Sequence, residues 1–151
     1  MTGATRPTCR PGRTTARGER GTSRRLRYRD VVPPPESALP ASVTDIDVAE
    51  ADRLVAAGAW MLDVREQDEW DAGHAPVAVH LPMGQVVDRM GELPTDRTIV
   101  CMCRLGGRSG SVALHLAGGG YDVRNIAGGM VAWAAADLPV VDGAGAPGRV
   151  V

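Results

Sequence analysis

The pattern of apolar and polar positions divides the chain near residue 41. Beyond that point, short apolar runs alternate with stretches in which apolar residues recur at helical spacing. This alternation predicts an α/β domain with a mainly parallel sheet. Residues 1–40 show neither a helical nor a strand period and are rich in Arg, Thr, Gly and Pro, which predicts a disordered tail.

Four strands and five helical segments are expected in the second part. The strands cover 60–64, 77–81, 98–102 and 123–126, and the helical segments cover 49–57, 66–70, 85–90, 108–116 and 130–136. Asp45 or Asp47 can cap the first helix, which Gly58 ends. The 151 residues, 44% of them hydrophobic, suffice for one core and not for two. We therefore expect one domain over 41–141 and a flexible C-terminal tail over 142–151.

Charge is distributed unevenly along the chain. Residues 1–30 hold nine Arg against two acidic residues, so this part carries about +7 and the remainder about −8. A basic tail can bind nucleic acid or an acidic partner, and this one also resembles an organellar transit peptide. Because Tyr28 is its only aromatic residue, we do not expect nucleic-acid binding. We prefer a solvated tail, or sequence upstream of the true start codon.

Cysteine usage and hydropathy indicate the compartment. Cys9, Cys101 and Cys103 are too few for a disulfide framework, and the chain has no apolar signal-peptide core. Polar residues interrupt every apolar run well short of the ~20 residues that a membrane span requires. We expect a soluble, cytoplasmic protein that binds no membrane. We expect no metal site, because two neighbouring cysteines are too few ligands for zinc.

Cys103 stands at the carboxyl end of the third predicted strand, before a glycine-containing loop and a helix start. Ligands bind at this edge of parallel sheets, and glycines let successive backbone N–H groups turn inward around a sulfur or an anion. The helix N-terminus adds its positive dipole end, and Arg104 and Arg108 add full charges. Such surroundings lower the pKa of a cysteine, so we expect a thiolate nucleophile.

The same donors would stabilise the outer sulfur of a persulfide and orient an anionic donor such as thiosulfate. The residues expected to bind substrate follow the cysteine directly and are Arg104, Leu105, Gly106, Gly107, Arg108 and Ser109. Ser109 is expected to cap the helix, with a bond to the bound sulfur as its lesser role. Cys101 lies on the same side of the strand as Cys103, and we expect it to pack in the core. The alternative is that its thiol attacks Cys103 as a resolving cysteine.

Four motifs occur in order over about a hundred residues, at 62–66 (Leu-Asp-Val-Arg-Glu), 69–76 (Glu-Trp-Asp-Ala-Gly-His-Ala-Pro), 103–109 (Cys-Arg-Leu-Gly-Gly-Arg-Ser) and 128–133 (Gly-Gly-Met-Val-Ala-Trp). Together they resemble the single-domain rhodanese family, which is thiosulfate sulfurtransferase-like. The resemblance implies a three-layer α/β/α domain with about five strands and a persulfide on Cys103. It also implies sulfane sulfur transfer to cyanide, a small thiol or a protein acceptor, without a cofactor.

Loop length separates this family from related enzymes. The sulfurtransferases close the loop over six residues, whereas the related phosphatases and arsenate reductases use one residue more, wide enough for a phosphorus-sized oxyanion. Cys103 through Arg108 counts six residues, which favours sulfur over phosphate. The alternatives to a sulfurtransferase are a low-turnover persulfide carrier or regulatory binding module and, third, a phosphatase or arsenate reductase.

Three further residues are expected to support the site. Asp63 and Arg65 end the strand beside Cys103 in the family arrangement, where we expect a structural ion pair that holds the loop, with Arg65 adding positive potential to the pocket. His74, by the same resemblance, braces the connection into the next strand. Substrate preference is open, because Val77 and Leu105 depart from the small residues that the family usually has there.

Overall fold

Five parallel strands form the sheet of the computed structural model, which describes residues 42–151. In sheet order they are β1 (Thr44–Ile46), β5 (Val123–Ile126), β4 (Ile99–Met102), β2 (Trp60–Asp63) and β3 (Ala78–His80). The strand that leads to Cys103, β4, is therefore central, between β5 and β2. The expectations for the tail over 1–40, Cys9 included, concern residues outside the described part.

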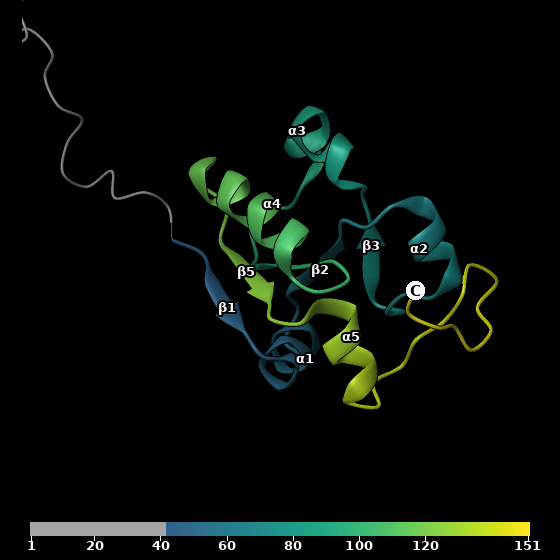
Figure 1. Cartoon of the computed structure of the whole chain (residues 1–151). Helices are drawn as coiled ribbons and strands as arrows, with labels where there is room; N and C mark the ends of the chain where they lie inside the picture. The colour runs from purple at the N-terminus through teal and green to yellow at the C-terminus, as the bar shows by residue number, and fades with distance from the viewer. Residues whose placement is uncertain (1–41) are drawn as a thin grey trace, which may run out of the picture. The chain divides into compact units, whose positions relative to one another are not determined.

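Helices cover both faces of this sheet (Figure 1). One face packs on α1 (Val48–Ala56) and α5 (Gly129–Ala135), and the other on α4 (Gly107–Gly118) and α3 (Val86–Arg89). The short helix α2 (Gln67–Ala72) follows β2, and two 3-10 turns, η2 (Met83–Gln85) and η3 (Met90–Glu92), flank α3. The predicted three-layer α/β fold is confirmed. No helix within residues 42–151 has both the length and the apolar character needed to cross a membrane.

Alternation along the central strands assigns each side chain to one of two cores. Leu62 and Cys101 belong to the core on the α4 side, whereas Met61 and Val100 belong to the core under α1 and α5. All four are buried, as expected for a parallel sheet covered on both faces. Cys103, two residues beyond Cys101, lies on the α4 side, which brings its sulfur to the N-terminal end of that helix.

Two elements differ from the predicted pattern. The edge strand β1 is not predicted, because its three residues are largely exposed and no apolar run marks it. The predicted helix over 85–90 is replaced by the three short pieces η2, α3 and η3, with Gly84 and Gly91 in the two 3-10 turns. The other predicted elements begin and end within two residues of the observed ones.

The C-terminal residues pack against α2, although the sequence predicts a flexible tail over 142–151. The Arg149 N–H donates to the carbonyl of Ala72 at 2.9 Å, and Val150 packs against the core. Gly73 permits this approach, since a Cβ there would lie 2.4 Å from the Arg149 carbonyl oxygen. Backbone hydrogen bonds hold this segment in place. Such bonds do not depend on a periodic pattern of apolar side chains, so the sequence gives no sign of them.

A fully buried ion pair joins the end of β2 to α2. Arg65 Nη2 lies 2.7 Å from Asp63 Oδ2, and Nε lies 3.0 Å from both carboxylate oxygens. The guanidinium also donates to the carbonyl oxygens of Glu69, at 3.1 Å, and Gly73, at 2.8 Å. Buried charges are tolerated when they are paired and hydrogen-bonded in this way. The pair therefore fixes α2 against the carboxyl edge of the sheet.

Replacing Arg65 with methionine should lower the free energy of unfolding by about 3–5 kcal/mol, because Asp63 would keep a buried charge without a partner. Urea unfolding measures the loss. The matched control is Arg97→Met, which removes the exposed partner of Asp96 and should cost no more than about 1 kcal/mol. Equal losses in the two variants would contradict the structural role of the buried pair.

Candidate active site

Cys103 opens a six-residue loop that joins β4 to α4 and ends at Arg108. The cysteine is buried, with 2% of its surface exposed. The Gly106 N–H donates to Sγ at 3.1 Å, and Ser109 Oγ lies 3.4 Å from Sγ. Gly106 has a left-handed φ of 99°, and a Cβ there would lie 3.0 Å from the Ile126 carbonyl oxygen. Only glycine fits both the conformation and the space.

The first two carbonyl groups of the loop point into the N-terminus of α5. The Met130 N–H donates to the Cys103 carbonyl at 2.8 Å, and the Val131 N–H donates to the Arg104 carbonyl at 3.1 Å. Gly129, with a φ of 53°, approaches these carbonyls so closely that a Cβ would lie 2.2 Å from the Cys103 oxygen. Because the carbonyls face α5, the loop presents N–H groups to the sulfur.

The two thiols of the described chain differ in acidity. Burial raises the pKa of Cys103, but hydrogen bonds from the Ser109 side chain and from backbone N–H groups of the loop outweigh it, so the net pKa lies below the ordinary value. Burial, and secondarily the nearby Cys103, raises the pKa of Cys101 to about 12. Cys101 therefore stays protonated at neutral pH, which favours core packing over a resolving thiol.

Arg108 is bound by Glu69 of α2. Its Nη1 and Nη2 lie 2.7 and 2.6 Å from the two carboxylate oxygens. This hydrogen-bonded pairing raises the pKa of Arg108 and holds the pKa of Glu69 below its usual value. The guanidinium thus anchors the start of α4 to α2, and its expected role in binding an anion stays a prediction. Glu69 is a partner that the sequence does not predict, and it lies 39 residues away along the chain.

The other two arginines expected near the sulfur are also bound to protein groups. The exposed Arg104 donates from Nε to the Val151 carbonyl at 2.9 Å. Arg65 directs its guanidinium at Asp63 and at carbonyls of the α2 segment. The buried Asp63 carboxylate is paired with this guanidinium, as expected of a structural ion pair, and a positive potential from Arg65 in the pocket stays a prediction. The ion pair of Asp63 and Arg65 holds α2 directly. It acts on the loop only through Glu69, the α2 residue that binds Arg108.

His74 lies beside α2 and the C-terminal segment. Its Nδ1 is 2.9 Å from the Trp70 carbonyl oxygen, and its ring stacks on the Trp70 ring with centroids 3.6 Å apart. An antiparallel bridge pairs its backbone with that of Val141. Trp70 also stacks with His80, whose Nε2 is 2.8 Å from the Arg65 carbonyl oxygen. His74 thus ties the segment that leads from α2 to β3 to Trp70 and Val141.

Ser109 lies in the first turn of α4 but does not cap it, because Gly106 is the residue before the helix. Its Oγ lies 2.7 Å from Asn125 Oδ1 and 3.2 Å from the Gly106 carbonyl oxygen. Asn125, on β5, donates from Nδ2 to Asp45 Oδ1 at 2.7 Å and to the same Gly106 carbonyl at 3.2 Å. Neither Asn125 nor Asp45 is predicted as a site residue. Asn125 could have been recognised as a polar side chain within the strand predicted over 123–126.

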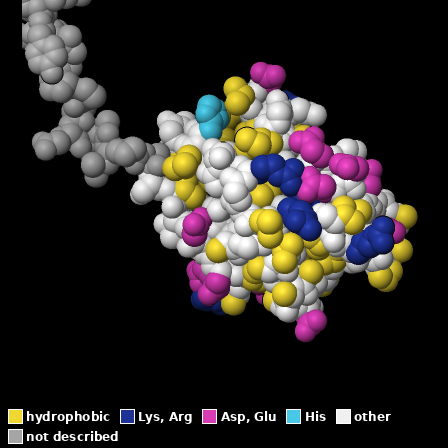
Figure 2. Space-filling model, in the orientation of Figure 1, with side chains coloured by type: hydrophobic (Ala, Val, Ile, Leu, Met, Phe, Trp, Pro, Cys, Tyr) yellow, Lys and Arg dark blue, Asp and Glu magenta, His cyan; other side chains and the backbone are white. Residues whose placement is uncertain are grey.

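The surface around the loop combines charged and apolar groups. Figure 2 shows arginine and acidic side chains next to one another where α2 and α4 meet. Leu105, in the middle of the loop, is 61% exposed. A hollow of about 370 Å³ adjoins the loop, and its lining includes Asp45, Asn125 and three glycines, Gly106, Gly107 and Gly110. Asp45 is therefore open to solvent, unlike Asn125.

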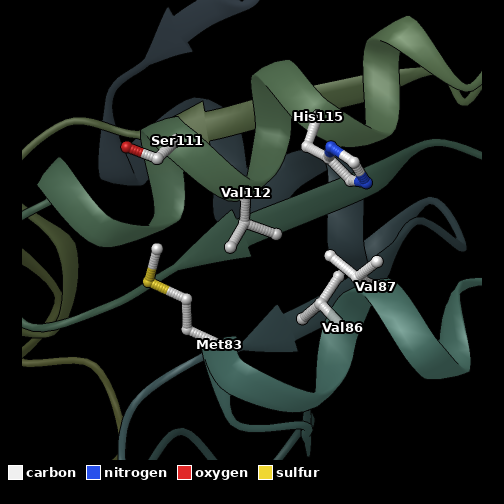
Figure 3. Close-up of a pocket in the computed structure, with 6 residues that line it drawn as sticks. All are labelled: Met83, Val86, Val87, Ser111, Val112 and His115. Carbon is white, nitrogen blue, oxygen red and sulfur yellow. The ribbon is translucent and has the colours of Figure 1, made fainter.

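A second hollow, of about 220 Å³, is apolar and lies between α4 and α3. Figure 3 shows Val112 and His115 of α4 across from Val86 and Val87 of α3. Cys103 does not line this hollow. The candidate site is therefore the loop itself.

The part of the chain that contains this loop is similar to known proteins. A family model described as the rhodanese-like domain matches residues 47–136. A sulfurtransferase of Allochromatium vinosum is 42% identical over 82 residues, which are 54% of this chain and 77% of that protein. Thiosulfate sulfurtransferase GlpE of Pseudomonas syringae is 34% identical over 56% of this chain and 80% of that protein. A solved structure of a rhodanese-related protein from Thermoplasma volcanium matches with a TM-score of 0.62 and 26% identity, over 65% of this chain and 97% of that one.

Gly129→Ala should slow the alkylation of Cys103 by iodoacetamide at neutral pH. The new Cβ would displace the Cys103 carbonyl and so misalign the N–H groups that hold the thiolate, and loss of one such bond corresponds to about a tenfold slower reaction. The measurement uses a Cys9→Ser background, so that the tail thiol does not react.

Gly120→Ala is the matched control, because Gly120 also has a left-handed φ, of 90°, but has open space around it. It should lower stability through backbone strain alone and leave the alkylation rate unchanged. Equal rates in Gly129→Ala and the control would contradict the role of the Gly129 contact.

The Glu69–Arg108 pair should make stability depend on pH. Hydrogen bonding to Arg108 lowers the Glu69 pKa below its ordinary 4.5 in the folded state, so the contribution is complete above 4.5 and is lost as the pH falls through the folded-state pKa. Urea unfolding should therefore show a deficit in Glu69→Gln above pH 4.5 that shrinks below it. Asp52→Asn, at an exposed carboxylate of α1, is the control. A loss of stability in Glu69→Gln that is the same above and below pH 4.5 would contradict the pairing.

Proposed function

Because the chain belongs to the rhodanese-like domain family, we propose that it moves a sulfane sulfur from a donor such as thiosulfate to a thiophilic acceptor through a persulfide on Cys103. At the level of the family, the chain is a sulfurtransferase or sulfur carrier. The proposal adds the donor, the persulfide and the class of acceptor.

The first half-reaction loads sulfur onto Cys103. The thiolate attacks the outer sulfur of thiosulfate, a bond forms between Sγ and that sulfur, and the bond between the two sulfur atoms of thiosulfate breaks. Sulfite leaves with the electron pair. The lowered pKa of Cys103 supplies the thiolate without a general base. Arg104 is the exposed cation of the loop and is the group that an anionic donor would meet first.

The second half-reaction unloads the sulfur. The acceptor, which is cyanide, a small thiol or a protein thiol, attacks the outer sulfur of the persulfide. The bond between that sulfur and Sγ breaks, and the Cys103 thiolate is regenerated. The sulfur passes without a net change in the oxidation state of the protein, so no oxidant or cofactor takes part.

The orientation of the loop backbone is the observation that carries this proposal. The carbonyls of Cys103 and Arg104 face α5, and the Gly106 N–H lies 3.1 Å from Sγ, so the sulfur is surrounded by donors. Donors of this kind stabilise both anions of the cycle, the thiolate and the persulfide. The six-residue loop, by the family resemblance, is also too short for a phosphorus-sized oxyanion.

The exposed side chain of Leu105 favours an acceptor with an apolar surface, such as a protein that carries a thiol. It is 61% exposed in the middle of the loop, where it offers contact area but no hydrogen-bond donor from its side chain. A carrier that passes its sulfur only to such a protein would form the persulfide but turn over cyanide slowly. This carrier is the second candidate function, and it uses the same cysteine.

Cys103→Ala should abolish the formation of thiocyanate from thiosulfate and cyanide, because the variant has no thiol in the loop to carry the persulfide. Cys101→Ala is the matched control, since its thiol is buried and protonated at neutral pH, and it should retain most of the activity. Colorimetric thiocyanate assays on the two purified variants and the wild type test this.

Thiocyanate formation by Cys103→Ala would overturn the proposal, as would a wild-type protein that forms no persulfide with any sulfane donor. A persulfide that forms without appreciable turnover would assign the protein to the carrier class. Hydrolysis of an aryl phosphate that depends on Cys103 would contradict the argument from loop length.

A further inference from the structure

The Glu69 carboxylate is held in one position by groups of the protein. Its Oε1 accepts a hydrogen bond from Arg108 Nη2 at 2.6 Å. Its Oε2 accepts one from Arg108 Nη1 at 2.7 Å and one from the Glu66 N–H at 3.1 Å. The backbone carbonyl of Glu69 accepts a further bond from Arg65 Nη1 at 3.1 Å. Both ends of the residue are therefore fixed, and its carboxylate faces the guanidinium that closes the loop.

Glu69 keeps its negative charge at neutral pH. Hydrogen bonding from Arg108 lowers the pKa of this carboxyl in spite of its burial. The Glu69 side chain is 15% exposed and that of Arg108 is 35% exposed, so solvent and salt screen these two charges less than charges on the open surface. The loop therefore has a permanent negative charge beside its last cation.

Arg108 lies near the sulfur. It is followed directly by Ser109, whose Oγ is 3.4 Å from Cys103 Sγ. Hydrogen bonding to Glu69 is the largest cause of the raised pKa of Arg108, and the charge of the Cys103 thiolate also contributes to it. The guanidinium is thus close enough to attract an anion that binds at the sulfur. While both Nη atoms donate to Glu69, the opposite charge of the carboxylate offsets that attraction.

We propose that Glu69 is a specificity-determining residue, which acts through Arg108 and limits the attraction of the site for small anionic donors. The inference rests on the proposed function, because it concerns which sulfur donors the loop prefers. A free dianion such as thiosulfate gains little from Arg108 as long as Glu69 holds it. An uncharged reagent is not affected by this pairing.

Other charges near the loop provide the comparison for Glu69. Asp68 belongs to the same helix, α2, and is exposed. Glu66 acts on Arg108 through its charge. The remaining cation of the loop, Arg104, donates to the Val151 carbonyl. The pairing with Arg108 therefore distinguishes Glu69 from an acidic residue that merely lies on α2.

The test compares two reagents that alkylate Cys103 by the same displacement, the anion iodoacetate and the neutral iodoacetamide. The ratio of their rates reports the charge beside the sulfur and does not depend on the fraction of thiolate. It is measured at neutral pH and low ionic strength in the full chain with Cys9→Ser, where the buried Cys101 is protonated. Glu69→Gln should raise the ratio of iodoacetate to iodoacetamide roughly fivefold, because Arg108 then acts with its full charge.

Three further variants separate the pairing from other effects. Asp68→Asn removes an exposed carboxylate from the same helix and should change the ratio by less than about twofold. Arg108→Gln leaves the Glu69 charge unpaired and should lower the ratio, which tests the same balance from the other side. Glu69→Gln combined with Arg108→Gln has the net charge of the wild type and should return the ratio to nearly the wild-type value.

Steady-state kinetics with thiosulfate and cyanide extend the test to the proposed reaction. Glu69→Gln should lower the KM for thiosulfate roughly fivefold or more and change kcat by less than about twofold, because weaker repulsion of a dianion affects its binding uniformly. A merely structural loss would lower kcat and would slow iodoacetate and iodoacetamide alike.

An unchanged ratio in Glu69→Gln would overturn the proposal. So would an equal rise in Asp68→Asn, an unchanged ratio in Arg108→Gln, or a rise that persists in the double variant. Alkylation needs no sulfur donor, so the ratio tests Glu69 independently of sulfur transfer. A ratio that rises as expected in a protein that forms no persulfide would support the role of Glu69 and count against the proposed function alone.

Discussion

The carbonyl groups of Cys103 and Arg104 point into the first turn of α5, and this contact decides what the loop offers to a sulfur. Met130 and Val131 hold these carbonyls away from the sulfur, and the Gly106 N–H donates to it. The contact requires Gly129, because any side chain there would overlap the Cys103 carbonyl. A thiolate is then favoured in a site that is otherwise buried, where the loss of water alone would keep the thiol protonated.

The charged residues around this loop serve mainly to hold it in place. Asp63 and Arg65 form a buried pair that fixes α2, and α2 carries the Glu69 that binds Arg108 at the start of α4. Arg65 and Arg108 are thus each paired with a carboxylate, whereas the exposed Arg104 donates to a backbone carbonyl. The groups that lower the pKa of Cys103 are the Ser109 hydroxyl and backbone N–H groups of the loop, which are fixed in place before a reaction begins.

The sequence predicts the features that depend on neighbouring residues and misses those that depend on distant ones. Strand alternation and the run from Cys103 to Arg108 are local, and the α/β class and the position of the cysteine follow from them, whereas the three-layer arrangement is predicted by the family resemblance. The partners of the loop are not local: Glu69 lies 39 residues from Arg108, and Asp45 lies 80 residues from Asn125. The packing of the C-terminal segment and of the short strand β1 depends on backbone pairing, which side-chain patterns do not report.

The central claim is that Cys103 accepts a sulfur atom, and mass spectrometry of the protein after incubation with thiosulfate tests it most directly. Because Cys101 and Cys103 lie in the same tryptic peptide, residues 98–104, fragment ions must distinguish them. The account predicts that the peptide gains one sulfur atom, that the gain lies on Cys103, and that cyanide removes it. A peptide that gains no sulfur, or gains it on Cys101, would contradict the account.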